Sequence, residues 1–260
     1  MNYYKRVDEL VDRALMGEDV TWLLGQMGIF LDNLDIQQNV SSQIKKTFES
    51  EVSNKKLLKR HSVAPYVIAA VLYKLQDERD NRIMTARTLA KIHKEKAKET
   101  VMQRFAGWAS SVPVLPQNRA KVNKVKLVRE IIKPIAKDLN KQDKLLANDQ
   151  SRKMVSNIDS IIANEAGAIG YYWHSLFRIP GYKYRIEHKH LDLDGKFIIL
   201  KDNWALKNGL MKKDGGIYQD QIEQPGELPN CKCSAVYVYK LDEIPPNCLT
   251  NKGLEYKKGI

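Results

Sequence analysis

The spacing of apolar residues along the chain changes once, near Gly170. Before this residue, apolar side chains recur at steps of three and four residues, as in Val7, Leu10 and Val11. Such a period is typical of helices that bury one face. After Pro180 apolar and polar residues alternate instead, which is typical of half-buried strands. We therefore expect helices first and strands after them.

These two periods predict an α+β fold, with a helical N-terminal region followed by a small α+β domain. We place the helical region, with its basic helices, at residues 1–165 and the α+β domain at residues 166–245. Residues 246–260 predict a loose basic tail. No internal repeat and no low-complexity tract interrupts this division.

Helix breakers divide the helical region into segments. Gly17 ends the first one, and Pro113 and Pro116 interrupt a later one, because two prolines three residues apart do not fit a helix interior. Helices are expected over residues 22–31, 35–60, 65–105, 119–146 with a kink or restart at Pro134, and 149–172. The unbroken segment 65–105 is either one extended helix or two helices. Its apolar residues need a cover, from a neighbouring helix or from a partner protein.

Three segments in the second part of the chain have the pattern of strands. They are residues 182–188, 197–200 and 233–239. In the last segment Cys233, Ala235 and Tyr237 share one face, because successive side chains of a strand point to opposite sides.

The composition favours a soluble chain with a polyanionic partner. Of the 260 residues 43% are hydrophobic, enough for one large domain or two smaller ones. No apolar run approaches the roughly 20 residues of a membrane span, and the N-terminus lacks a signal-peptide pattern, so we expect neither a membrane nor secretion. Three cysteines do not indicate a disulfide framework. A net charge of +12 and a pI near 9.4 favour nucleic acid or an acidic partner over a surface that is basic for solubility alone.

Two groups of basic residues have helical spacing, which places each group along one helix face. The first is Lys126, Arg129, Lys133, Lys137, Lys141 and Lys144, and the second is Arg87, Lys91, Lys94 and Lys98. Residues 119–153 contain eleven lysines and arginines against four acidic residues, a surplus of +7. Like charges four residues apart repel, so we favour a surface that binds the DNA backbone over a solvated helix face. Without a base-reading motif or many interleaved aromatic residues, we expect double-stranded DNA to be bound non-specifically.

The sequence between Gly167 and Tyr239 contains an ordered set of residues that resembles a known family. In chain order the set is Trp173, Arg185, His188 or His190, Asp194, Gly195, Pro229, Cys231 and Cys233. It resembles the signature of the phage Mu F-like head-morphogenesis proteins, which are minor capsid proteins. That signature is an Arg, a His, an Asp-Gly pair and a Pro-x-Cys-x-Cys before a strand. The Arg-x-x-His spacing of the family fits His188, whereas its spacing of four residues from His to Asp fits His190.

Several residues near the C-terminus could bind a metal. The donors are His188, His190, Cys231, Cys233 and Cys248, which together could form a zinc site. However, Cys-x-Cys is not the usual Cys-x-x-Cys spacing, and a strand through both cysteines would hold their sulfurs too far apart for easy joint ligation unless a turn intervenes. We therefore favour an interpretation without a metal or other cofactor, in which Cys233 is a buried reduced thiol and a histidine is hydrogen-bonded to the loop.

The resemblance implies a structural role in a virion. It implies a non-catalytic minor head protein that acts in head assembly and in DNA packaging or ejection, inside the head or at the portal vertex, after assembly in the host cytoplasm. The implied partners are portal protein, major capsid protein or both.

A DNA-binding protein free in the cytoplasm stays open as an alternative to this role, and so do two enzymes. The family domain is similar in fold to ADP-ribosyltransferases, although no Gln-x-Glu or Glu-x-Glu pair accompanies Glu187. A metal-dependent nuclease is the second alternative, with His188, His190 and Asp192 or Asp194 as metal ligands.

Overall fold

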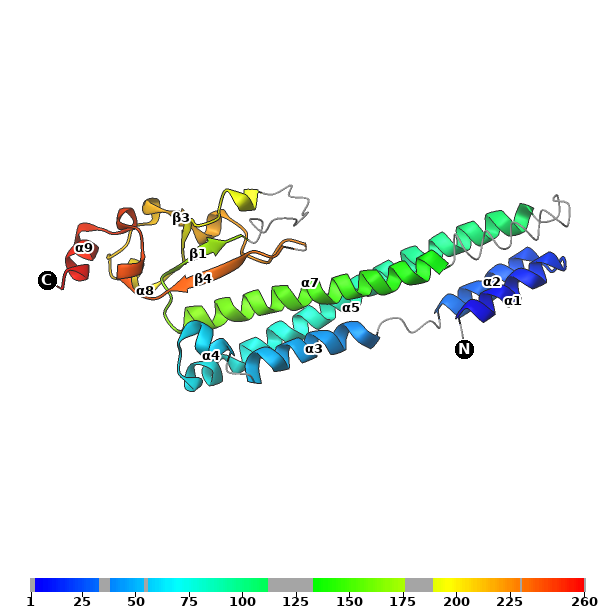
Figure 1. Ribbon diagram of the computed structural model, residues 1–260, viewed down its shortest axis with the longest axis horizontal. Coiled ribbons are helices and arrows are strands. Elements are labelled where there is room, and N and C mark those ends of the chain that lie inside the picture. Colours follow the sequence, from blue (N-terminus) through cyan, green and yellow to red (C-terminus); the bar gives the residue numbers. More distant parts are fainter. Residues whose placement is uncertain are drawn as a thin grey trace. The chain divides into compact units, whose positions relative to one another are not determined.

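Long helices come first along the chain, and a small sheet follows them (Figure 1). The computed structural model describes residues 3–32, 38–53, 56–111, 133–175, 189–229 and 231–259. The helices are α1 (Tyr3–Leu15), α2 (Val20–Asp32), α3 (Gln38–Ser53), α4 (Lys56–His61), α5 (Pro65–Ser111), α7 (Lys133–Glu165), α8 (Trp204–Lys207) and α9 (Asn251–Lys257). The strands are β1 (Gly170–His174), β2 (Phe197–Ile199), β3 (Ile217–Tyr218) and β4 (Ser234–Val238). Short 3-10 turns are η4 (Lys189–Leu191), η5 (Lys213–Gly215), η6 (Gln219–Gln221), η7 (Leu241–Glu243) and η8 (Pro246–Cys248). This order confirms the predicted α+β fold class.

The two longest helices agree with the helical period of the sequence. The segment after Pro65 is one continuous helix, α5, which decides between the two alternatives for it. Its apolar residues Val71, Leu75 and Ile83 are buried within the chain, so no partner is needed to cover them. Pro134 lies in the first turn of α7, where the N–H group that proline lacks is not needed by the helix.

Several predicted helix boundaries are wrong. Segment 35–60 forms two helices, α3 and α4, and α5 continues to Ser111, past the predicted end at residue 105. The predicted break between residues 146 and 149 does not occur, because α7 runs without interruption from Lys133 to Glu165, and it ends there instead of at residue 172. Gly167 has a φ of +79°, the left-handed conformation in which helices commonly end. Tyr172 therefore lies in β1 and not in a helix. Several predicted features lie outside the described residues: Pro113, Pro116, the part of the predicted helix over residues 119–132, and the strand over residues 182–188.

The chain folds into two compact units, each of which combines segments that are far apart in sequence. The first unit comprises Met1–Gln43 and Met84–Ala147, and the second comprises Ile44–Ile83 and Asn148–Ile260. This division differs from the predicted boundary at residue 165. Parts of the long helices α5 and α7 pack into the same unit as the sheet, so the change of period does not coincide with a unit boundary.

The core of the first unit is built by α1, α2 and the C-terminal part of α5. Leu10, Leu23, Met27 and Phe105 are fully buried in it. Buried residues recur at helical spacing on each of these helices, as Leu23, Met27 and Leu31 do on α2, so each helix contributes one apolar face.

The sheet of the second unit has the strand order β3-β2-β1-β4. β1 pairs antiparallel with both β2 and β4, whereas β2 and β3 run parallel. Gly170 stands opposite Ile199 on one side and Val238 on the other. A Cβ atom at Gly170 would overlap the ring of Phe197 and the carbonyl oxygen of Ile198. The close approach of β1 and β2 therefore requires glycine at this position.

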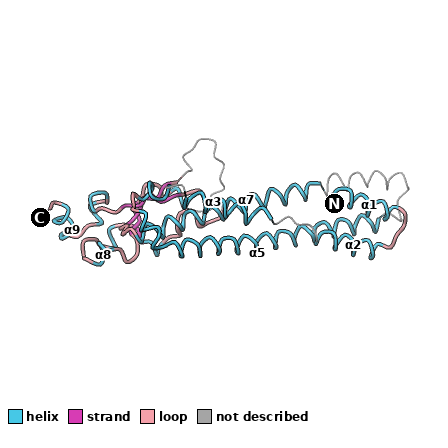
Figure 2. The backbone as a smooth tube through the Cα atoms, turned by 90° about the horizontal axis from the view of Figure 1, so that it is seen from below, coloured by secondary structure: helices cyan, strands magenta, loops and turns pink. Residues whose placement is uncertain are grey.

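Both faces of the sheet are covered. On one face Phe197, Ile199 and Val238 pack with the C-terminal segment. On the other face the core contains Tyr171, Trp173, Ile198, Leu200, Cys231 and Cys233, together with Ala163 of α7. The C-terminal end of α7 accordingly lies beside the strands in both Figure 1 and Figure 2. The two cysteines belong to this second face.

A polar network joins α4, α7 and the residue after β4 within the second unit. His61 is 3% exposed, and its Nδ1 and Nε2 atoms lie 2.8 Å from Tyr239 Oη and 3.0 Å from Asp159 Oδ1. Arg60 forms ion pairs with the same Asp159 and with Glu51. Because His61 is buried with both ring nitrogens paired, the network fixes how the short helix α4 meets the sheet.

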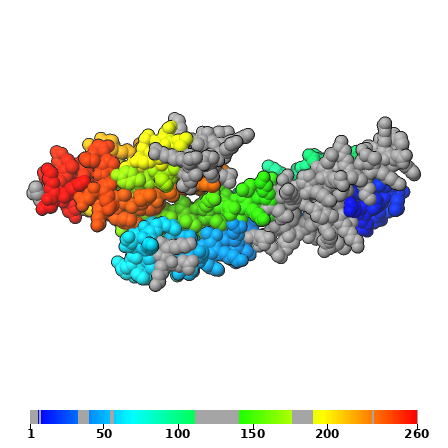
Figure 3. Space-filling view, in the orientation of Figure 1, coloured from blue at the N-terminus to red at the C-terminus, as the bar shows by residue number. Residues whose placement is uncertain are grey.

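The sequence predicted a loose tail over residues 246–260, but the described part of this segment is folded. It contains η8 and α9, and Thr250 caps α9 by accepting a hydrogen bond from the Gly253 N–H at 3.1 Å. Leu249 is buried against the sheet. On the face drawn in Figure 3, the segments from η4 to α9 form one closely packed body. The sequence suggested a tail because this segment is rich in lysine and its apolar residues are few and scattered.

Candidate functional site

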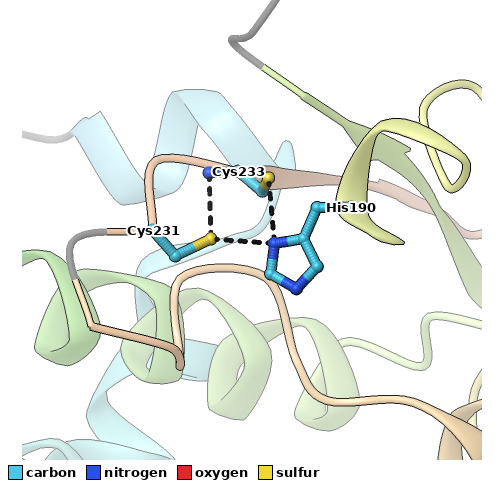
Figure 4. A group of neighbouring side chains, drawn as sticks. All are labelled: His190, Cys231 and Cys233. Atoms are coloured by element: carbon cyan, nitrogen blue, oxygen red, sulfur yellow. Dashed lines mark hydrogen bonds between the residues drawn. The ribbon is translucent and has the colours of Figure 1, made fainter. Parts of the chain in front are cut away.

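Three residues of the sequence motif, His190, Cys231 and Cys233, meet in one side-chain cluster (Figure 4). His190 lies in η4, and the two cysteines lie in the loop that precedes β4 at Ser234. The exposed fractions of the three are 4%, 2% and 5%. The cluster is therefore closed off from solvent.

The imidazole of His190 presents one nitrogen to both sulfurs. Nδ1 lies 3.4 Å from Cys231 Sγ and 3.7 Å from Cys233 Sγ. The backbone N–H of Cys233 donates to Cys231 Sγ at 3.4 Å. The indole of Trp173 packs edge-on against the imidazole, with ring centroids 5.0 Å apart. These contacts hold the imidazole between the sulfurs and the indole.

The loop before β4 brings the two sulfurs to the same side. A turn closes between Leu228 and Cys231, where the Cys231 N–H donates to the Leu228 carbonyl at 3.0 Å. Gly226, with a φ of +85°, packs against the side chain of Ser156 of α7. A strand through both cysteines would have held their sulfurs apart, whereas a turn before the strand, the exception that the sequence allowed, brings them together. Because both cysteines precede the strand, their sulfurs can reach one ion together.

The pKa values of the two thiols are shifted in opposite directions. The pKa of Cys231 is lowered to about 5, first because the Cys233 thiol donates to its sulfur, and also because backbone N–H groups of Cys233 and Gly226 do so. The pKa of Cys233 is raised, since its proton is held by Cys231 and since it is buried. The pair thus favours a thiolate on Cys231, directly beside His190.

The Asp-Gly pair of the motif positions the cluster and is not part of it. Asp194 accepts a hydrogen bond from the Ser175 N–H at 2.7 Å. Gly195, with a φ of +74°, donates its N–H to the Trp173 carbonyl at 2.8 Å. These bonds fix the return of the chain from η4 to β2 alongside β1, and so they orient both His190 and Trp173. Pro229 lies in the loop just before Cys231.

The remaining residues of the predicted set are not in the cluster. Arg185 and His188 lie outside the described residues, so within the described part the histidine that meets the cysteines is His190. Cys248 packs in the core of the other sheet face, where its thiol donates to the Gly215 carbonyl at 3.1 Å. The sequence pattern did not indicate Ser175 and Gly226, because they act through backbone groups that no residue pattern reveals.

The basic helix faces are only partly described. Lys126 and Arg129 lie outside the described residues, the side chains of Lys133 and Lys137 are not described, and Lys141 and Lys144 are exposed. In the second group Arg87 and Lys91 are exposed, whereas Lys94 donates to the backbone carbonyl of Asp32 at 2.8 Å. Lys98 forms an ion pair with the Asp32 carboxylate. Arg87 also donates from Nε to Ser41 Oγ at 3.1 Å, so three of the four cations are engaged inside the first unit.

The described part of the chain contains few of the side chains that the two enzyme alternatives would need. A surface pocket beside α8 is lined by residues that include Lys201, Asp202 and Trp204, and it has no glutamate, histidine or cysteine in its lining. His190, Cys231 and Cys233 are the one group of three such side chains among the described residues whose donor atoms lie close enough to share an ion. Glu187 and His188 lie outside those residues.

Comparisons of the chain with protein-family models, with curated proteins and with solved structures each return no match. Among the described helices, none combines the length and the apolar character needed to cross a membrane.

Proposed function

We propose that the chain is a structural, non-catalytic minor head protein of a phage, which acts in head assembly and in DNA packaging or ejection at or near the portal. One observation supports this proposal above the others. In the sequence His190 precedes Cys231 by 41 residues and Cys233 by 43 residues. In the structure the three side chains meet in one buried cluster, which Asp194 and Gly195 help to position. The residues that carry the resemblance therefore serve a common structural purpose.

Burial favours a structural role for this cluster over catalysis. A catalytic group must reach its substrate, and all three side chains are at most 5% exposed. The cluster instead ties η4 to the loop before β4 in the interior of the second unit. A nuclease would also need open access for a DNA strand at its metal ligands.

Portal protein, major capsid protein or both are the protein partners of this proposal, and the virion is the location. Although some apolar residues of α5 are buried within the chain, other side chains of this helix are exposed and available for such a contact. Tyr66, Leu72 and Tyr73 lie exposed in the N-terminal part of α5, with exposed fractions of 75%, 37% and 60%. Exposed tyrosines such as Tyr66 and Tyr73 are common where proteins meet. The presence of the chain in purified heads tests the proposed role.

Double-stranded DNA is the third partner, bound through its phosphates. Charge reversal of Lys133, Lys137 and Lys141 should weaken binding equally for all sequences, because cations that neutralise phosphates act through counterion release. The slope of log affinity against log salt should become shallower by about 0.9 for each phosphate that the variant no longer neutralises. Fluorescence anisotropy with two unrelated duplexes over a salt series measures both effects.

The control reverses the same number of charges elsewhere. Lys207, Lys212 and Lys240 are exposed in the second unit and belong to neither basic helix face. Their reversal should lower affinity much less, although the net charge changes equally. Unchanged affinity in the first variant, or equal decreases in both, would show that the predicted helix face does not bind DNA.

A further inference from the structure

We propose that His190, Cys231 and Cys233 bind a zinc ion through Nδ1 and the two sulfurs, and that this ion fastens η4 to the loop before β4. Such a site would exist whether or not the chain acts in a phage head. Its support comes from the positions of the three side chains, from their chemistry and from their burial.

The distances fit joint ligation of one small ion. With bonds of about 2.3 Å to sulfur and about 2.0 Å to nitrogen, sulfur and nitrogen ligands of a tetrahedral zinc ion lie about 3.5 Å apart. The two distances from Nδ1 to sulfur are 3.4 and 3.7 Å, and the three ligand atoms lie within 4.8 Å of one another. Little rearrangement is needed to place an ion between them.

The burial of the cluster also restricts which ions fit it. All three side chains are at most 5% exposed, and a buried charge is costly unless an opposite charge lies beside it. Two thiolates and one divalent cation are neutral together.

The donor set selects the kind of ion. Two thiolates and one imidazole suit zinc, whereas calcium and magnesium prefer oxygen. The hydrogen bond from the Cys233 N–H to Cys231 Sγ stabilises a negatively charged sulfur, which is the form that binds metal. Cys248 is excluded as a third sulfur, because it packs in the core of the opposite sheet face. A water molecule or another oxygen or nitrogen donor completes the tetrahedron.

The test uses the full-length chain, purified under reducing conditions, incubated with zinc chloride and freed of excess metal. We expect about one zinc ion per chain by mass spectrometry of the metal content, since structural sites bind zinc tightly. X-ray absorption at the zinc edge should show two sulfur and two nitrogen or oxygen neighbours. Replacement by cobalt should produce the charge-transfer absorption of a thiolate–cobalt bond.

Matched variants assign the ligands. Cys231→Ser and Cys233→Ser should each weaken zinc binding at least tenfold, whereas Cys248→Ser, which removes an equally buried thiol outside the cluster, should leave it unchanged. The wild-type chain provides a measurement that does not depend on variants that fold. Chelation of the metal should make Cys231 and Cys233 react with an alkylating reagent much faster than before, while Cys248 stays slow.

Three results would overturn the proposal. They are a reconstituted wild-type chain with well under one zinc ion, zinc that persists in Cys231→Ser with unchanged affinity, and a disulfide between Cys231 and Cys233 in the protein as isolated from cells.

Discussion

The substitution Gly170→Ala should lower the free energy of unfolding of the second unit by about 3 kcal/mol, the upper end of the usual cost of overpacking. The added Cβ would overlap the Phe197 ring and the carbonyl oxygen of Ile198. The ring can rotate, but the carbonyl belongs to β2, where Ile198 pairs with Tyr171 of β1. The strands must therefore separate. The midpoint of denaturant unfolding and the reactivity of the buried thiols measure the effect.

The same substitution in a helix should have the opposite sign. Among the described residues beyond its own helix turn, no heavy atom lies within 4 Å of a Cβ built at Gly107 of α5, and its backbone has ordinary helical geometry. Gly107→Ala should stabilise the chain by up to about 1 kcal/mol, because alanine favours the helix. If Gly170→Ala and the wild type unfolded at the same denaturant concentration, the register of β1 against β2 would be wrong.

The second large effect is expected from Trp173→Ala, which should cost about 3–5 kcal/mol. Trp173 is 1% exposed in the core that also holds the two cysteines, and its indole packs against His190. Its removal leaves a cavity and frees the imidazole to turn away from the sulfurs. Denaturant unfolding measures the first effect, and the alkylation rate of Cys231 and Cys233 measures the second.

Two variants separate packing from simple removal of a tryptophan. Trp22 is 42% exposed with the guanidinium of Arg13 over its ring at 4.1 Å, so Trp22→Ala should cost less than about 1 kcal/mol. Trp173→Phe keeps a ring beside His190 and should retain most of the thiol protection. Similar decreases in stability in Trp22→Ala and Trp173→Ala would contradict the position of Trp173 in the core.

The period of the sequence predicted those elements that bury one continuous face. It located α1 and α5, and it located β2 and β4 to within two residues, because their apolar residues repeat at the spacing of the element. It missed β1, whose Tyr171, Tyr172 and Trp173 are all large aromatic residues and so show no alternation. It also missed β3, which is only two residues long.

The sequence named the members of the candidate site but not their arrangement. It provided His188, His190, Cys231, Cys233 and Cys248 as donors and left the histidine undecided. The choice depends on contacts between segments 41 and 43 residues apart, which local spacing does not determine. The turn that places both cysteines before β4 depends on the packing of Gly226 against α7, which is also a tertiary contact.

The most direct test of the proposed function is the protein inventory of purified phage heads by quantitative mass spectrometry, with the heads assembled in cells that produce this chain. We predict that the chain is present in DNA-filled heads at far lower abundance than the major capsid protein, and that it is depleted from heads assembled without portal protein. Its absence from purified heads that contain both portal and capsid proteins would contradict the assignment to the head.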